Sequence, residues 1–186
     1  MKINPSPFVK LLATIFCCAI FSQSTVTHAA DKQEIDIKVQ QTLTQFRKTV
    51  GGADSFLNKA NGVLVFPDVV KAGFGIGGEY GEGALLINSK TVSYYNTVSA
   101  SIGFQLGAQV KNVIIVFLDP EALKKFRASQ GWEVGVDGSV ALIELGAGKS
   151  IDSTSINKPI VGFVFGNKGL MYNLTLEGSK FSKIVR

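Results

Sequence analysis

Cysteine and histidine are absent from most of this 186-residue chain. Both cysteines, Cys17 and Cys18, and the single histidine, His28, lie within the first 29 residues. Beyond that point the chain therefore has no disulfide framework, no thiol nucleophile and no imidazole base for a catalytic triad. A structural zinc site with the usual cysteine and histidine ligands is excluded as well. Only carboxylates remain as ligands for a cation, and we expect neither a metal nor another cofactor.

Long apolar runs are also scarce, and the clearest one lies near the N-terminus. It spans residues 11–21, follows two lysines and precedes the triplet Thr27-His28-Ala29, which has small residues at its first and third places. This order is typical of a secretory signal peptide that is cut after its small-residue triplet. We expect residues 1–29 to be removed and residues 30–186 to form a single domain that is periplasmic or secreted.

Two alternatives stay open for this N-terminal segment. The first is a retained membrane anchor, although the apolar run is shorter than the about 20 residues that cross a bilayer. The second is a lipoprotein anchored through Cys17 or Cys18. Lipoprotein signals place a small residue just before the modified cysteine, whereas Phe16 precedes Cys17 in this chain.

Charge is sparse and unevenly placed. The net charge of +5 falls to +3 (5 − 2) when the two lysines of the expected signal peptide are removed. This mild excess does not point to nucleic acid. Most of it lies in residues 158–186, which oppose Glu177 with five cations: Lys158, Lys168, Lys180, Lys183 and Arg186. A local basic segment indicates an anionic partner or surface, and an ordinary solvated lysine face is the alternative.

Apolar spacing predicts a long helix at residues 31–50. Its stripe consists of Ile35, Val39, Leu43, Phe46 and Val50, at the spacing of one helical face. A short helix is expected at residues 53–60. Another should begin after Asp119, with Pro120 at its first position, and end near residues 129–131.

The remaining segments show β periodicity and contain most of the 20 glycines. The clearest is residues 97–110, where apolar and polar residues alternate strictly, which indicates β structure with one apolar face and a bend near Gly103 or Gly107. Further strands are expected at residues 63–66, closed by Pro67, and at residues 113–118, 132–145, 160–165 and 170–176. The sequence Gly166-Asn167-Lys168-Gly169 predicts a hairpin turn. The chain is therefore expected to be α+β, with a mostly antiparallel, glycine-rich sheet or barrel and a short inserted helix.

Two motifs with possible chemistry do not develop into a catalytic site. Residues 73–78 satisfy G-x-G-x-x-G, but no helix is expected directly after them to receive a phosphate, so glycine-rich β structure is favoured. Glu79 and Glu82 are expected to share a glycine-rich loop with Tyr80, and Glu133 and Asp137 form a second carboxylate pair on one expected strand. Neither pair has a third catalytic partner, and we expect no enzyme activity.

Four long blocks of the sequence resemble the SYLF domain family: GVLVFPDVVKAGFGIGGEYGEGALL, SYYNTVSASIGFQLGAQVKNVIIVF, GWEVGVDGSVAL and PIVGFVFGNKGLMYNLTLEGSKFSKI. The resemblance covers roughly residues 50–186. It implies phospholipid binding, with phosphoinositides as the ligands of eukaryotic relatives, and actin binding in a fungal member. No enzyme activity belongs to the family.

The resemblance also implies where lipid contact occurs. An amphipathic N-terminal helix and basic surface residues are implicated in eukaryotic members, and the helix at residues 31–50 matches the first of these in kind. The candidate lipid-binding residues are Lys38, Arg47 and Lys48 on this helix, together with Lys168 at the expected hairpin tip and Lys180, Lys183 and Arg186 near the C-terminus.

Three hypotheses for function follow. The first is a non-enzymatic domain that binds anionic phospholipid at the cell envelope. The second is a structural or protein-binding envelope factor whose lysines are only solvated. The third is an outer-membrane β-barrel, which the strand alternation favours and which the long helix and the basic C-terminal segment disfavour.

Overall fold

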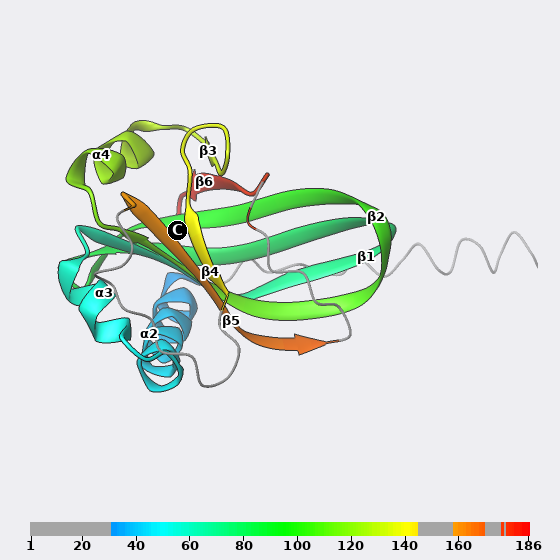
Figure 1. Ribbon diagram of the computed structural model, residues 1–186, viewed down its shortest axis with the longest axis horizontal. Helices are drawn as coiled ribbons and strands as arrows, with labels where there is room; N and C mark the ends of the chain where they lie inside the picture. The colour runs from blue at the N-terminus through cyan, green and yellow to red at the C-terminus, as the bar shows by residue number, and fades with distance from the viewer. Residues whose placement is uncertain (1–30, 145–157, 170–175, 177) are drawn as a thin grey trace, which may run out of the picture.

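A computed structural model of the protein describes residues 31–144, 158–169, 176 and 178–186 (Figure 1). The described part is α+β, as predicted. Its helices are α2 (Lys32–Thr49), α3 (Ala53–Lys59) and α4 (Pro120–Ala128). Its strands are β1 (Gly62–Ile87), β2 (Lys90–Phe117), β3 (Trp132–Glu133), β4 (Ala141–Glu144), β5 (Ile160–Gly169) and β6 (Lys180–Ile184).

Strands β1 and β2 form one long antiparallel ribbon at the centre of the sheet. They pair from Gly62 with Phe117 to Ile87 with Lys90. The ribbon folds back on itself near residues 73–77, where a Cβ atom on Gly73 would lie only 2.5 Å from the Cα atom of Gly77. This bend separates two halves of β2. Residues 94–98 of β2 pair with β6, and residues 109–117 pair with β5. Among the described strands, the curled sheet has β3 and β4 at its two edges.

Helix α2 packs its apolar stripe on one face of this sheet. The predicted stripe residues are buried there against apolar side chains of the strands. The ring of Phe46 lies 4.9 Å from that of Phe163 and 5.4 Å from that of Phe165. Asp36 accepts hydrogen bonds from the hydroxyl groups of Thr91 (2.8 Å) and Tyr94 (2.9 Å). Within the described residues, no helix combines the length and the apolar character needed to cross a bilayer.

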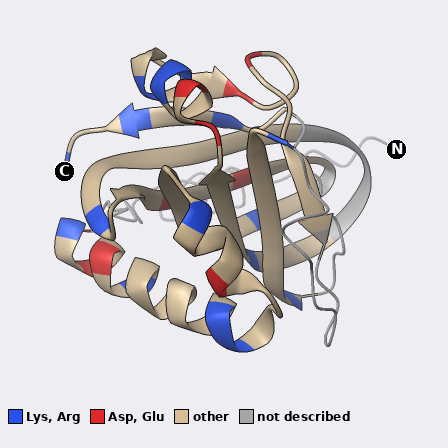
Figure 2. Cartoon of the chain, turned by 60° about the vertical axis from the view of Figure 1, so that its left-hand side comes forward, with Lys and Arg blue, Asp and Glu red and all other residues tan. Residues whose placement is uncertain are grey.

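Helix α4 packs on the opposite face (Figure 2). It begins as predicted, because the side chain of Asp119 accepts from the backbone N–H groups of Glu121 and Ala122 at 3.2 Å. Its buried residue Phe126 contacts Phe117 and Trp132 in the second core. We call the two sides of the sheet the α2 face and the α4 face.

Two strand boundaries predicted from local turn signals are wrong. Strand β1 does not end at Pro67, because a register shift between Phe66 and Val69 lets pairing with β2 continue, and the backbone N–H of Asp68 is satisfied by Asn112 Oδ1 at 3.1 Å. Residues 166–169 form no hairpin turn. They complete β5, in which Lys168 pairs with Val110, and the positive φ angles of Gly166 and Gly169 serve an irregular strand. The strand expected at residues 170–176 lies almost wholly outside the described residues.

Candidate functional site

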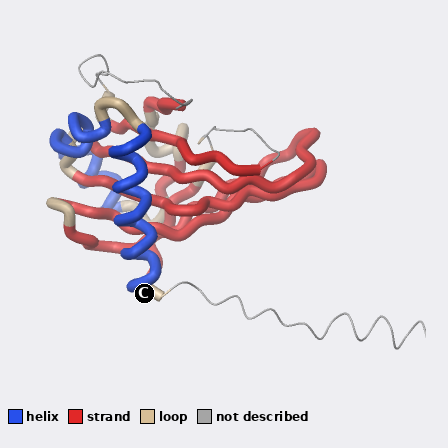
Figure 3. Tube along the Cα trace, turned by 90° about the horizontal axis from the view of Figure 1, so that it is seen from below, coloured by secondary structure: helices blue, strands red, loops and turns tan. Residues whose placement is uncertain are grey.

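The folded ribbon extends well beyond helix α2 (Figure 3). We call this projecting part the arm, and define it as residues 69–82 of β1 and 96–111 of β2. Under the helix, the α2 face of the ribbon is covered by apolar side chains of α2. On the arm, none of the described helices covers the same face (Figure 3), and several of its apolar side chains are exposed.

The usual burial pattern of a sheet is reversed on the arm. Its α2 face exposes apolar side chains: Val70 is 48% exposed, Tyr80 49%, Val98 46% and Ile76 71%. Its α4 face buries polar side chains: Lys71 is 3% exposed, Glu79 4%, Thr97 2%, Gln109 1% and Lys111 0%. The glycine-rich motif at residues 73–78 lies in β structure, as expected, and forms part of this arm.

The exposed apolar side chains lie in register across the arm. Tyr80 pairs with Val98, and Val70 pairs with Val110. Gly81 lies directly against Val69, which places Tyr80 beside Val70 across the fold of the ribbon. Lysine stands at each end of this row, because Lys180 pairs with Val98 and Lys168 pairs with Val110. The order across the sheet is Lys180, Val98, Tyr80, Val70, Val110, Lys168.

A second row lies closer to the tip of the arm and consists of small residues. Gly78 pairs with Ala100, and Ala72 pairs with Ala108, and all four are exposed. Ile76 follows at the tip. We call these two rows of side chains and Ile76, without the terminal lysines, the apolar face: Val70, Ala72, Ile76, Gly78, Tyr80, Val98, Ala100, Ala108 and Val110.

Beneath the apolar face, the other side of the arm holds a buried ionic cluster. Lys111 Nζ lies 2.9 Å from Glu79 Oε2, with both side chains almost fully buried. Burial lowers the pKa of the neighbouring Lys71; Glu79 opposes this effect and Lys111 adds to it. Within the described structure, the side-chain amide of Gln109 has no hydrogen-bond partner for either its oxygen or its nitrogen. Among the described side chains, the cluster contains two cations, Lys71 and Lys111, against one anion, Glu79.

One end of the apolar face borders a polar hollow of about 120 Å³ between α2 and the arm. Lys38 of α2 and Lys168 of β5 both line it, together with Asp68. Lys38 also forms an ion pair of 2.7 Å with Glu34, and this hydrogen-bonded contact raises the pKa of Lys38. Two of the candidate lipid-binding residues, 130 positions apart (168 − 38), are therefore brought together.

Comparison with known families then identifies this part of the chain. Residues 98–184 match the family model described as "Ysc84: Las17-binding protein actin regulator". This segment is therefore similar to the SYLF (Ysc84) family, in agreement with the resemblance of the sequence blocks. The matched segment runs from Val98 in β2 through α4 to β6. A search of curated proteins found no match. SYLF domains form a binding family, so this match supports a binding function in general.

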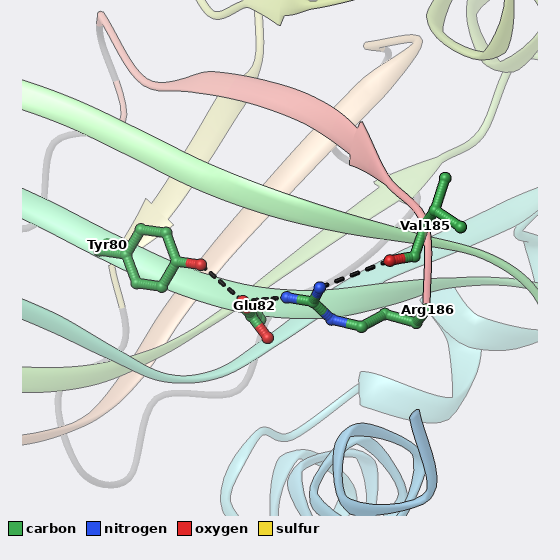
Figure 4. A network of polar contacts seen from close by, with 4 residues as sticks. All are labelled: Tyr80, Glu82, Val185 and Arg186. Atoms are coloured by element: carbon green, nitrogen blue, oxygen red, sulfur yellow. Dashed lines mark hydrogen bonds and ion pairs between the residues drawn. The ribbon is translucent and has the colours of Figure 1, made fainter. Parts of the chain in front are cut away.

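Of the other candidate residues, Arg47 and Lys48 lie away from the apolar face, whereas Arg186 lies at its border. Arg47 pairs with Asp54 at 3.1 Å, and Lys48 lies on the exposed side of α2. Arg186 contacts Glu82, which also accepts a hydrogen bond of 2.6 Å from the hydroxyl of Tyr80 (Figure 4). Burial raises the pKa of Tyr80 to about 12, with a further contribution from that hydrogen bond.

Neither carboxylate pair places its two side chains around one ligand site. Glu79 and Glu82 lie on one strand rather than in a loop, and they point to opposite faces of the sheet, so they cannot act on one ligand. Asp137 accepts a hydrogen bond of 2.7 Å from the backbone N–H of Glu133, which closes a turn. No group of three or more acidic, cysteine or histidine side chains is placed to hold a metal ion within the described residues.

Sequence reasoning missed one basic site of the protein. Lys183 lies on the α4 side, where it lines a hollow of about 370 Å³ together with Lys124 and Arg127 of helix α4. Tyr95 also lines this hollow. The three cations come from segments about 60 residues apart (183 − 124 = 59). The basic C-terminal segment therefore indicated Lys183 but not Lys124 or Arg127. The spacing of Lys124 and Arg127 along one helix was the signal available for the others.

Proposed function

We propose that this SYLF domain binds anionic phospholipid at the cell envelope, as a periplasmic or secreted protein without enzyme activity. The observation that carries the proposal is the row across the arm, in which exposed apolar side chains lie between Lys180 and Lys168. An anionic bilayer presents phosphates above an apolar interior. A surface with cations at both margins and apolar side chains between them complements that arrangement.

The arm supports this function better than helix α2 does. The family resemblance points to an amphipathic helix, yet the apolar stripe of α2 is already buried against the sheet. Its exposed side offers Lys48, while Lys38 and Arg47 are paired with acidic residues. A helix in this position has no free apolar side to lay on a membrane, whereas the arm has one.

A second candidate function is protein binding at the envelope. It is favoured by the hollow under α4, where Lys124, Arg127 and Lys183 surround a volume of about 370 Å³ on the side of the sheet away from α2. An acidic segment of a protein partner fits such a site by charge. This hollow and the apolar face lie on opposite faces of the sheet, so the two functions depend on different residues.

Replacement of both marginal lysines, as K168Q/K180Q, is expected to weaken binding to phosphatidylglycerol-containing vesicles by about thirtyfold at low salt. Each cation near an anionic surface contributes about 1 kcal/mol, and the two together contribute about 2 kcal/mol. The loss should shrink as salt is added, because screening shortens the range of the interaction. Co-sedimentation with vesicles measures it, with phosphatidylcholine vesicles as the uncharged reference.

The matched control is K90Q/K125Q, which removes the same charge from two exposed lysines outside the row. It is expected to bind nearly as well as the unmodified protein. Equal losses in the two variants would show that net charge, rather than the row, determines binding. If the unmodified protein binds no anionic vesicle, the proposed function is wrong and the protein-binding candidate takes its place.

A further inference from the structure

We propose that the apolar face of the arm embeds in one leaflet of the bilayer, lying face-on below the phosphates, while Lys168 and Lys180 remain at phosphate level. This inference rests on the proposed function, because it takes the membrane as the partner. It goes further because it assigns the apolar contact to the arm and specifies which side chains enter the bilayer.

The reversed burial of the arm is the first argument. In a sheet with one wet side, apolar side chains point to the core and polar ones to water. Under α2 both faces of the ribbon are covered and apolar: Val65 and Ile114 are buried on the α2 face, and Phe66 and Val113 are buried on the α4 face. On the arm, in contrast, Val70 and Val98 are exposed on the α2 face, while Lys71 and Gln109 are buried on the α4 face. Apolar-out, polar-in alternation is the pattern of strands that face lipid.

The distribution of charge on the arm is the second argument. Beyond the two lysines, every described side chain on the α2 face toward the tip is apolar or glycine: Ala72, Ile76, Gly78, Ala100 and Ala108. The lysine stems are long enough to lie along the apolar surface while their ammonium groups reach the phosphates. Glu82 lies on the same face, and its charge is countered by Arg186.

The same charges disfavour a second copy of the chain as the occupant of this face. Both ends of the row carry lysine, and Glu133 flanks Lys180 at one margin alone, so two apolar faces stacked in parallel or antiparallel orientation bring lysine against lysine at both margins. Like charges in contact oppose such pairing. An anionic lipid surface meets both lysines favourably, and it covers the apolar residues between them.

The depth of the arm can be measured with a label on a single cysteine. The protein would be expressed with Cys17 and Cys18 replaced by serine, so that an environment-sensitive dye reacts with I76C alone whether residues 1–29 are removed or kept. Ile76 is 71% exposed at the tip of the apolar face. The matched control is V136C, since Val136 is also apolar and 75% exposed but lies in the turn after β3. Phosphatidylglycerol vesicles with bromines on the acyl chains quench only labels that reach below the phosphates.

Embedding predicts strong quenching and a blue-shifted emission for the label at position 76, and neither change for the label at position 136. Co-sedimentation in the same samples reports binding separately. Binding without quenching at position 76 would overturn embedding and leave the proposed function intact. Absence of binding would overturn both. A label at position 76 that becomes shielded without vesicles, as the protein concentration rises, would assign the face to a second copy and overturn embedding.

A variant gives an independent measurement of the same inference. I76D/V98D is expected to weaken binding by roughly a hundredfold, one factor of about ten for each apolar side chain withdrawn from lipid. Unlike the loss in K168Q/K180Q, this loss should persist at high salt. Both positions are exposed in the free protein, so its thermal melt should remain near that of the unmodified protein. Vesicle binding by I76D/V98D at the unmodified level would contradict embedding.

Discussion

Replacement of Glu79 with glutamine is expected to lower the free energy of unfolding by about 3–5 kcal/mol, the usual cost of removing one partner from a buried ion pair. Lys111 has no exposed side-chain surface and lies 2.9 Å from Glu79. Lys71, buried on the same face, is also attracted by Glu79 and repelled by Lys111. The substitution removes the one anion that the described residues contribute to this cluster and leaves Lys71 and Lys111 buried without it.

Replacement of the other partner, as K111M, should lower the free energy of unfolding by less, because Glu79 keeps Lys71 as a partner. We expect E79Q to be the more destabilised of the two in urea melts. The matched control is E121Q, in which the same change is made in an exposed pair with Lys124 at 3.5 Å. Exposed pairs contribute about 0–1 kcal/mol. An E79Q protein as stable as E121Q would show that the buried cluster contributes nothing to folding.

The stability of E79Q should also depend on pH in a defined direction. Glu79 raises the pKa of Lys71 against the lowering effect of burial, so its removal lowers that pKa further. Between the folded pKa and the ordinary value of 10.5, the unfolded chain binds more protons than the folded one. Stability therefore rises with pH in that window. The difference in the free energy of unfolding between E79Q and the unmodified protein should therefore decrease as the pH rises toward 10.5.

The secondary-structure elements that were predicted correctly are those determined by residues close together in the sequence. Helix α2 follows from apolar spacing over 18 residues, and α4 follows from an aspartate and a proline at its start. The turn predicted at residues 166–169 was wrong for the opposite reason. Glycines with positive φ suit a tight turn and an irregular strand equally, and the choice was made by pairing with β2, more than 50 residues away.

The candidate site also depends on contacts between segments that are far apart in the sequence. Strict alternation in residues 97–110 identified a strand with one apolar face, but alternation does not say which face is covered. That depends on where α2 ends its contact with the ribbon and on the fold near Gly73. Lys168 and Lys180 were selected from a basic segment, and both lie beside the apolar face. Their separation by four apolar residues arises from pairings that span the whole sheet.

Replacement of Phe46 with alanine is expected to lower the free energy of unfolding by about 3–5 kcal/mol, the usual range for a buried phenylalanine. Its ring is fully buried and lies 4.9 Å from Phe163 and 5.4 Å from Phe165. These contacts hold α2 to the sheet, and an isolated helix of 18 residues is only marginally stable in water. Urea melts measure the loss. I37A is the matched control, because Ile37 belongs to the same helix and is 52% exposed.

The same variant separates the two possible roles of α2. If the helix left the sheet to lay its apolar stripe on a membrane, Phe46 would contact lipid, and F46A would bind vesicles more weakly even where it remains folded. If α2 stays packed while the arm makes the apolar contact, F46A should be destabilised in solution yet bind phosphatidylglycerol vesicles normally at temperatures below its melt. We expect the second result, because the stripe is already buried against the sheet. Weaker binding by folded F46A would move the membrane contact from the arm to the helix.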